Sequence, residues 1–289
     1  MQKLKVKKKE KNNFSGEIAF ENYYSQCFAQ RWSALKESFF IENLYFELDC
    51  GSTEKYFLDS ASVLSASCLP LENATNILDL CAAPGGKTLV LATRMNENAK
   101  LISNERSAER RNRLISVIKS CLSSDIANRI SVTGFDGTLA CKKFDTKFDS
   151  ILLDAPCSSE RHVLQNPKYL SQWTKSRIKN LSYTQWALLS SAFLTLNDEG
   201  FLLYSTCAIS TDENDGVIEK LLKKYCNCQC IELDFTKIYE KLPSNLKIPK
   251  LKVEKTKFGY QILPDVNKGA GPIFFCLIQK HKCDKITDK

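Results

Sequence analysis

The sequence predicts an α/β protein built on a doubly wound, mostly parallel sheet, with an antiparallel edge strand and a helical amino-terminal extension. The first observation is that short apolar strands alternate with amphipathic helices through the middle of the chain. The second is a pair of late apolar strands, separated by a turn-rich stretch that begins at Pro264. The third is a stripe of large apolar residues at helical spacing near the amino terminus.

The amino-terminal region divides into a basic tail and a helical extension. Residues 1–14 hold six lysines and one glutamate, and we expect a solvated tail there. From about Glu17 large apolar side chains share one helical stripe, which we interpret as a packed helix face: Tyr24, Phe28, Trp32, Leu35 and Phe39. A second short helix is predicted at 57–68, before Pro70. We therefore place a helical extension at 15–70 and the main domain at 71–289.

The main domain is predicted to alternate strands with helices. Its parallel strands are expected at 76–80, 100–104, 130–133, 148–153 and 200–204. Intervening helices are expected at 87–95, 107–120 and 171–196, and they would cover both faces of the sheet. The late strands at 259–263 and 272–279 would form an antiparallel pair that closes the sheet edge.

Composition and charge exclude several classes of protein. A hydrophobic fraction of 43% with 26% charged residues argues against disorder, and no apolar run approaches the ~18 residues of a membrane span. The net charge of +8 is unevenly placed, because segments 1–14, 237–257 and 278–289 carry +5, +5 and +2 and leave the rest near −4. We expect these basic segments to contact a polyanion.

Cysteine is the residue type that points to chemistry. The chain has thirteen cysteines, an odd number without the spacing of a disulfide framework, and this favours a reducing compartment. Because His162 and His281 are the only histidines, a multi-histidine metal centre is excluded. The run Cys226-Asn-Cys-Gln-Cys230 has no second pair and no nearby histidine, so we predict no metal site.

A nucleoside-binding crevice is predicted at the carboxyl ends of the strands. The first parallel strand runs into Asp79-Leu-Cys-Ala-Ala-Pro-Gly-Gly-Lys-Thr88, whose small residues allow a ligand to approach the backbone. Three later strands are followed by Glu105, Asp136 and Asp154. Any one of these acids is equally well read as a helix cap or a solvated loop residue, whereas their shared edge favours a ligand.

Two cysteines follow neighbouring strands at that same edge. Cys157 comes after Asp154-Ala-Pro, and Cys207 comes after Ser205-Thr. A free cysteine is more often a small core residue, so position is what favours chemistry here. The sequence predicts a thiolate nucleophile, with the second thiol handling a proton and Asp154 supplying hydrogen bonds.

These motifs resemble the signatures of the Sun/Fmu (NSUN-type) RNA cytosine-5 methyltransferases, in a compact form. The matching segments are 79–88, Asp-Ala-Pro-Cys-Ser at 154–158 and Tyr-Ser-Thr-Cys at 204–207. Residues 104–114 and 271–275 resemble the family's second motif and last strand, so the likeness spans about 20–280. The resemblance implies a Rossmann-like class I methyltransferase sheet and S-adenosylmethionine as cofactor.

The resemblance also implies residue roles. Cys207 would add to C6 of a target cytosine, Asp154 would hold N3 and the exocyclic amine, and Cys157 would help remove the C5 proton and expel Cys207. Lys87 would stand near Asp154. The expected cofactor residues are Cys81, Ala82, Ala83, Pro84, Gly85, Gly86, Lys87, Glu105, Arg110, Asp136 and Asp154. Glu105 replaces the aspartate common in the family, and its longer side chain still reaches a ribose.

The implied substrate is RNA, with ribosomal RNA the first expectation and tRNA the second. A DNA cytosine-5 methyltransferase lacks the Thr-Cys partner that Cys207 provides here. We expect a monomer in the cytoplasm, or else in the mitochondrial matrix, with a protein partner as one possible source of RNA affinity. Two other classes stay open: a non-catalytic RNA-binding or ribosome-assembly factor, and a cysteine hydrolase with His162 as base. The intact cysteine pair argues against the first, and no oxyanion-hole motif supports the second.

Overall fold

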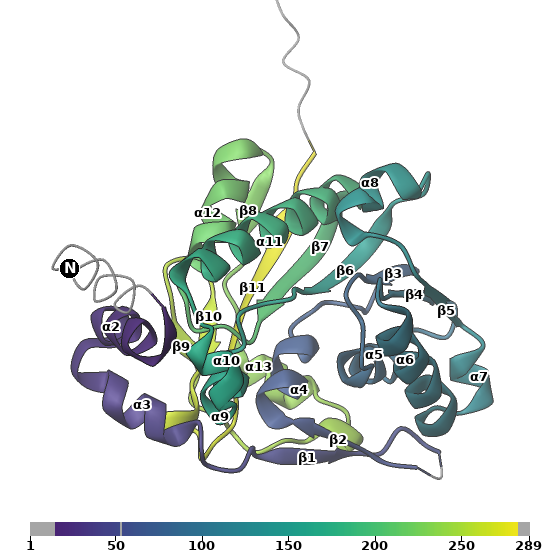
Figure 1. Ribbon diagram of the computed structural model, residues 1–289. Coiled ribbons are helices and arrows are strands. Elements are labelled where there is room, and N and C mark those ends of the chain that lie inside the picture. The colour runs from purple at the N-terminus through teal and green to yellow at the C-terminus, as the bar shows by residue number, and fades with distance from the viewer. Residues whose placement is uncertain (1–14, 53, 283–289) are drawn as a thin grey trace, which may run out of the picture.

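The computed structural model describes residues 15–52 and 54–282, and its centre is one mixed sheet with helices on both faces (Figure 1). The strands of this sheet are β3 (Asn76–Asp79), β4 (Lys100–Asn104), β5 (Ile130–Thr133), β6 (Phe148–Asp154), β7 (Leu196–Thr206), β8 (Cys228–Cys230), β9 (Glu254–Lys255), β10 (Tyr260–Ile262) and β11 (Ile273–Lys280). They lie in the order β5-β4-β3-β6-β7-β11-β10-β9, and β8 pairs with β11. The first five of that order are parallel, which confirms the predicted doubly wound sheet.

The antiparallel part of the sheet is larger than predicted. The late pair is confirmed as β10 and β11, which are antiparallel. However, β11 lies inside the sheet, because it pairs with β7 on one side and with β10 on the other. The two-residue strand β9 forms the edge next to β10. β7 also begins earlier than predicted, since Leu196 pairs with Phe148 ahead of a β-bulge.

Alternating strand residues build two separate cores. Ile77 and Leu152 face a core formed with α4 (Ser60–Ser67), α5 (Gly86–Ala92) and α6 (Ala108–Cys121). Leu78 and Leu153 point to the opposite face, which α8 (Ala140–Lys143), α11 (Lys175–Thr195) and α12 (Asp215–Lys224) cover. The remaining helical elements are α7 (Ser124–Ala127), α9 (Glu160–Gln165), α10 (Pro167–Ser171), α13 (Phe235–Lys241), η2 (Gly137–Leu139), η3 (Ser244–Leu246) and η4 (Pro264–Val266). Side chains alternate between the two faces of each strand, so a residue's position along the strand determines which set of helices its side chain contacts.

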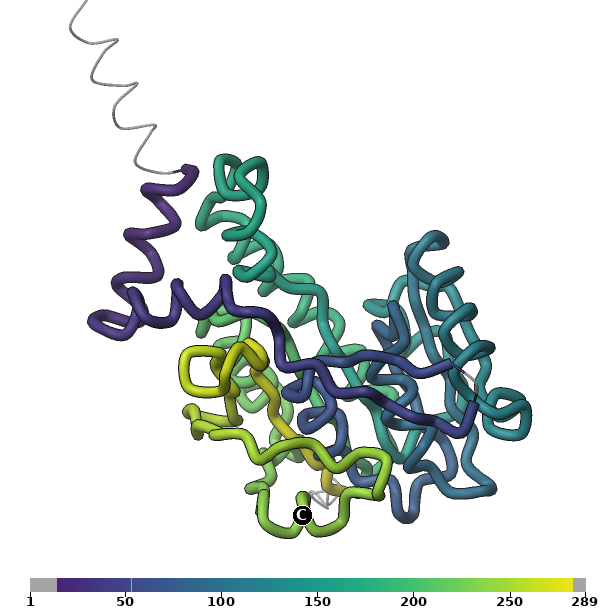
Figure 2. Tube along the Cα trace, turned by 90° about the horizontal axis from the view of Figure 1, so that it is seen from below, coloured from purple at the N-terminus to yellow at the C-terminus, as the bar shows by residue number. Residues whose placement is uncertain are grey.

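The amino-terminal stripe forms two helices rather than one. α2 (Gly16–Phe28) and α3 (Trp32–Ser38) are joined by the short helix η1 (Ala29–Arg31), and Ala29 has a φ of +48° that redirects the chain. The stripe still packs as predicted, because Tyr24, Trp32 and Phe39 are buried in a third core with residues of α9 and α11. Figure 2 shows these helices beside the rest of the domain, so the extension shares a core with it.

The segment 15–70 also contains a β-hairpin that the sequence pattern did not reveal. β1 (Tyr45–Leu48) and β2 (Tyr56–Asp59) pair antiparallel, and Figure 2 shows them running along one side of the domain. The helix predicted at 57–68 therefore begins only at Ser60, where the Asp59 side chain accepts a hydrogen bond from the Ala61 amide. Four-residue strands give too few alternations to be separated from the first turn of the following helix.

Within residues 15–52 and 54–282, no helix is both long and apolar enough to cross a membrane. The same residues contain no group of three or more His, Cys, Asp or Glu side chains that could hold a metal ion, and their twelve cysteines are free thiols. The predicted basic tail at 1–14 lies outside the described residues.

Candidate active site

A cleft of about 1280 Å³ opens at the carboxyl ends of β3, β4, β6 and β7. Parallel strands bring their carboxyl ends to one edge, and this edge is where ligands bind in open α/β sheets. The cleft wall includes nine of the residues predicted from the sequence: Cys81, Ala83, Lys87, Glu105, Arg110, Asp136, Asp154, Cys157 and Cys207. The structure thus brings together side chains that are up to 126 positions apart, as between Cys81 and Cys207.

The other four predicted residues shape the turn between β3 and α5 instead of lining the cleft: Ala82, Pro84, Gly85 and Gly86. The Ala82 amide donates to the carbonyl of Asn104 at 2.9 Å, which fixes the turn to β4. Gly85 has a φ of +121°, a conformation that favours glycine. A Cβ atom on Gly86 would lie 2.7 Å from the Leu58 side chain. Small residues are therefore needed here for close packing against β2 and α6.

Two carboxylates line the part of the cleft next to β4 and β5. Glu105 is 5% exposed, and its Oε1 accepts a hydrogen bond from the Ser107 amide at 2.8 Å. Its Oε2 lies 3.4 Å from Arg110, whose guanidinium also donates to the Ala83 carbonyl at 2.6 Å. Hydrogen bonds from the Thr138 hydroxyl and amide lower the pKa of Asp136. Both acids therefore present fixed acceptor oxygens to the cleft.

Asp154 is oriented by a lysine and a serine. Lys87 Nζ lies 2.7 Å from Asp154 Oδ2, and the Ser205 hydroxyl donates to Oδ1 at 2.8 Å. Burial opposes the charge on Lys87, but the attraction of Asp154 outweighs it and raises the pKa of the lysine. The Lys87–Asp154 pair expected from the family resemblance is present, and it fixes the carboxylate at the end of β6.

The two predicted cysteines meet above the sheet. Their Sγ atoms lie 2.8 Å apart, and Cys207 is exposed to the cleft. The Ser159 hydroxyl lies 3.3 Å from the Cys207 sulfur and 3.5 Å from that of Cys157, and Ser159 has a φ of +56°. The hydrogen bond from Cys157 lowers the pKa of Cys207, and the same contact raises the pKa of Cys157. Cys207 is therefore the thiol that becomes a thiolate first.

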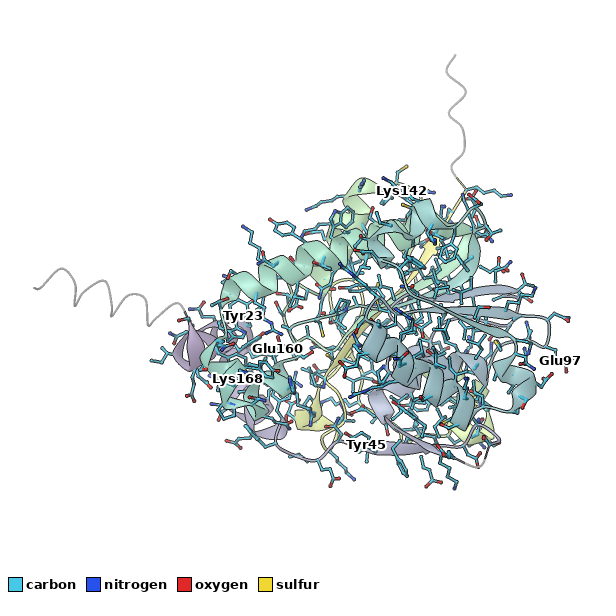
Figure 3. All side chains as sticks on the ribbon, turned by 45° about the vertical axis from the view of Figure 1, so that its right-hand side comes forward. Tyr23, Tyr45, Glu97, Lys142, Glu160 and Lys168 are labelled. Carbon is cyan, nitrogen blue, oxygen red and sulfur yellow. The ribbon has the colours of Figure 1, made fainter. Side chains whose placement is uncertain are left out.

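A buried acidic network lies directly behind the thiols. The Ser158 hydroxyl contacts the carboxylates of both Glu160 and Glu213, and the Ser158 amide donates to Glu213 at 2.9 Å. Gln185 of α11 donates to Glu213 at 2.9 Å, and Tyr24 of α2 donates to Glu160 at 2.5 Å. Figure 3 labels Glu160 near Tyr23, on the side of the molecule where α2 lies. The network ties the loop after β6 to the loop after β7 and to the amino-terminal extension.

Glu213 gives the fold a predicted pH dependence. Its burial raises the pKa of the carboxyl to about 7 from an ordinary 4.5. The folded protein therefore holds a proton that the unfolded chain releases between these values, so the free energy of unfolding falls as the pH rises from about 4.5 to 7. The contribution is about 3 kcal/mol across this window. Asp79, whose pKa burial also raises to about 7, acts in the same direction.

Urea unfolding at pH 5 and pH 7.5 measures this effect. The parent protein is expected to lose unfolding free energy between these two pH values. We expect Glu213→Gln to remove a large part of that loss, because glutamine keeps the acceptor oxygen and does not titrate. The control is Glu219→Gln on α12: the hydrogen bond from Lys257 lowers the pKa of Glu219, so its titration lies below the window. An unchanged pH dependence in Glu213→Gln would contradict the assignment of the proton to this carboxyl.

Several residues of this site escaped the sequence reasoning. Asn104 donates to the carbonyls of Leu80 and Phe135, and its side-chain oxygen accepts from the Phe135 amide, so it ties together the loops after β3 and β5. It stood at a predicted strand end, as the first residue of the 104–114 segment that resembles the family's second motif, but no role was expected for its side chain. Ser159 followed the recognised cysteine motif directly. Glu213 carried no signal, because it lies in a polar run that reads as a solvated loop.

Several known proteins are similar in sequence to this chain. A family described as 16S rRNA methyltransferase RsmB/F matches residues 66–275. Ribosomal RNA small subunit methyltransferase F from Serratia proteamaculans is 34% identical over 209 residues, which are 70% of this chain and 42% of that protein. The protein of the same name from Shewanella oneidensis is 37% identical over 174 residues, 60% of this chain and 36% of its own length. The chain thus spans less than half the length of these relatives.

Solved structures of other proteins share the fold of this chain. NSun6 from Pyrococcus horikoshii, solved with the S-adenosylmethionine analogue SFG, is 25% identical with a TM-score of 0.62, over 79% of this chain and 54% of that chain. A methyltransferase homologue from Pyrococcus horikoshii is 18% identical with a TM-score of 0.67, over 91% of this chain and 95% of its own. The match over residues 66–275 covers most of the sequence, so the chain belongs to the RsmB/F family of 16S rRNA methyltransferases.

Proposed function

We propose that this protein is an S-adenosylmethionine-dependent RNA cytosine-5 methyltransferase, with ribosomal RNA as its substrate and tRNA as the second candidate. One observation carries the proposal: an exposed Cys207 lies beside Cys157 in a cleft that also holds Asp154. Methylation at C5 of a pyrimidine requires a nucleophile for C6, because C5 of an aromatic cytosine is a poor nucleophile. A thiolate next to a second thiol meets that requirement.

The cleft residues fit S-adenosylmethionine. Glu105 and Asp136 offer carboxylate oxygens at the positions where a ribose diol and a nucleoside base sit in doubly wound folds. Cys81 and Ala83 line the wall where the turn after β3 approaches the cleft. When bound, the cofactor supplies an electrophilic methyl group on a sulfonium. A volume of about 1280 Å³ leaves space for one extruded base beside it.

The chain's own residues account for activation of the base. The Cys207 thiolate forms a bond to C6, the π pair of the C5–C6 double bond shifts into the C4–C5 bond, and the C4–N3 π pair moves onto N3. C5 thereby becomes the nucleophilic carbon of an enamine. Asp154 accepts a hydrogen bond from the exocyclic amine and holds the ring with C6 facing Cys207. Lys87 and Ser205 hold that carboxylate in place before substrate arrives, so no reorganisation is needed.

Cys157 is suited to the second half of the reaction. While Cys207 is a thiolate, the contact with it keeps Cys157 protonated. Once Cys207 is bonded to C6 its negative charge is gone, the pKa of Cys157 falls, and Cys157 can lose its proton to solvent. The Cys157 thiolate then accepts the C5 proton, the C5–C6 double bond re-forms, and the bond from C6 to Cys207 breaks. This sequence restores a thiolate at Cys207.

The product identity tests the proposal. Unmodified small-subunit ribosomal RNA, transcribed in vitro, is incubated with the protein and methyl-labelled S-adenosylmethionine, and the RNA is digested to nucleosides. We expect the label to co-elute with 5-methylcytidine. A parallel reaction with unmodified tRNA separates the two candidate substrates by rate. Label in a ribose-methylated or N-methylated nucleoside would contradict C5 chemistry, and an absence of label on both RNAs would favour the non-catalytic alternative.

The cellular location, the oligomeric state and the RNA contacts of the protein are also proposed. We propose a cytoplasmic monomer, with the mitochondrial matrix as the alternative location and a protein partner as a further source of RNA affinity. We also propose that the extension at 15–70 contacts RNA, because its helices α2 and α3 share a core with α9 close to the thiols.

A further inference from the structure

Beside the cleft, a second hollow of about 710 Å³ runs between α11 and α12. Four lysines line this α11–α12 groove: Lys175 and Lys179 from α11, and Lys220 and Lys223 from α12. Figure 1 shows the two helices side by side on the face of the sheet that also carries α8. A groove with lysines on both walls is suited to a chain of phosphates.

Two acids, Asp212 and Glu219, also line the groove and are outnumbered by its four lysines. Glu219 lies 2.9 Å from Lys257 Nζ and 3.4 Å from Lys223 Nζ, so two cations share its charge. Asp212 accepts a hydrogen bond from the Tyr23 hydroxyl at 3.3 Å. Four lysines against two carboxylates leave the groove with a positive balance.

Tyr183 connects the α11–α12 groove to the catalytic cleft. Its side chain lines both hollows, and it is 54% exposed despite its large ring. The Lys220 ammonium lies 5.3 Å from the centroid of that ring, which is cation–π distance. An exposed ring between the cleft and a lysine-lined groove is placed to stack on a base while the neighbouring phosphates meet lysines.

Two of the lysines that the sequence had suggested for phosphate binding lie far from this groove. Lys237 and Lys241 of the 237–257 segment line a hollow with Pro70 and Glu72, residues that come before the amino end of β3. The thiols lie past the carboxyl ends of the strands, at the other end of the sheet. Lys237 is 3.3 Å from Asp234, and Lys241 is 4.0 Å from Glu72. Their charge is both remote from the cleft and partly neutralised.

We propose that the α11–α12 groove binds the single-stranded RNA that flanks the target cytosine, with Tyr183 stacking on the adjacent base. The inference rests on the proposed function, which identifies the bound polymer as RNA. It adds the path that the RNA strand follows across the protein surface. A base drawn into the cleft stays covalently joined to its neighbours, so the strand must cross the cleft rim. Tyr183 forms the part of the rim that continues into a basic groove.

Binding measurements test the groove without relying on catalysis. The probe is a fluorescein-labelled 12-nucleotide single-stranded RNA with one central cytosine, followed by fluorescence anisotropy from 50 to 300 mM KCl. We expect the double variant Lys179→Glu/Lys220→Glu to bind at least about 10-fold more weakly at 100 mM salt. Its log–log salt slope should be shallower by about 1.4, since each lost phosphate contact on a single strand removes about 0.7.

Charge-matched and ring-matched variants complete the test. Lys237→Glu/Lys241→Glu makes the same change of charge at the far end of the sheet, and we expect its slope and affinity to stay close to those of the parent protein. Tyr183→Ala should weaken binding about 10-fold, while Tyr183→Phe keeps the ring and should bind like the parent. Calorimetric binding of S-adenosylmethionine should be equal in the parent protein and in both lysine-pair variants, which shows that the cleft is intact.

Each outcome decides the proposal. Equal losses in the two lysine pairs, or no loss in Lys179→Glu/Lys220→Glu, would overturn it in favour of diffuse charge attraction or another RNA path. If the parent protein forms no 5-methylcytidine but RNA binding still depends on Lys179, Lys220 and Tyr183, the groove stands and the proposed reaction fails. If methylation is intact in Lys179→Glu/Lys220→Glu with an unchanged KM for RNA, the reaction stands and the groove fails.

Discussion

Cys207→Ala is expected to lose methyl transfer to RNA by at least about 10⁴-fold, because removal of a covalent nucleophile leaves C5 of cytosine unactivated. The side chain is exposed to the cleft, so its truncation leaves no cavity in any of the three cores. We therefore expect the melting temperature and the affinity for S-adenosylmethionine to match those of the parent protein. The rate is measured as label incorporated into RNA under single-turnover conditions.

Cys226→Ala supplies the matched control for this loss. Cys226 is also exposed, but it follows α12 and is absent from the cleft wall. The same chemical change there should leave the rate within about 2-fold of the parent. A Cys207→Ala enzyme that keeps a tenth or more of the activity would exclude the thiolate of Cys207 as the essential nucleophile.

Cys157→Ala is expected to separate the first methyl transfer from turnover. Cys207 and Asp154 remain, so the first cytosine in each active site should still be attacked and methylated. Without Cys157 the C5 proton has no nearby base, and the bond to Cys207 breaks slowly. We expect a burst of close to one methyl group per protein, followed by a steady rate at least about 100-fold below that of the parent.

Rapid quenching of the reaction at several RNA-to-protein ratios measures the burst. Loss of the hydrogen bond from Cys157 also removes the influence that lowers the pKa of Cys207, so the burst itself should be slower at pH 7 and recover as the pH rises. Multiple turnovers at the parent rate would show that another group, such as Ser159 or a water molecule, removes the proton.

The parallel half of the fold was predictable because its residues obey simple rules. β4 and β5 have the predicted bounds, because each is a short stretch with apolar β-branched or leucine residues between helical segments. The meeting of Cys157 and Cys207 was predictable for a related reason: residues that follow neighbouring parallel strands come together at one edge of the sheet. The cleft residues Glu105, Asp136 and Asp154 follow the same logic. Periodicity and topology are enough to place them.

Features that depend on tertiary contacts were not predictable. The break between α2 and α3 rests on the conformation of Ala29, which no pattern of apolar residues encodes. Glu160 and Glu213 appear in the sequence as ordinary surface acids, and only the fold shows both buried around Ser158. The charge of segment 237–257 predicted a phosphate contact, but sequence alone could not show that Lys237 and Lys241 lie at the opposite end of the sheet from the thiols.

The central claim is that Cys207 bonds to the target cytosine and that Cys157 is needed to release it. Mass spectrometry of Cys157→Ala after incubation with the RNA substrate and S-adenosylmethionine tests it most directly. The account predicts a protein–RNA adduct that survives denaturation, maps to the peptide containing Cys207 and carries one methyl group on the bound nucleotide. The double variant Cys157→Ala/Cys207→Ala should form none. An adduct on any other residue, or equal adduct in the double variant, would contradict the account.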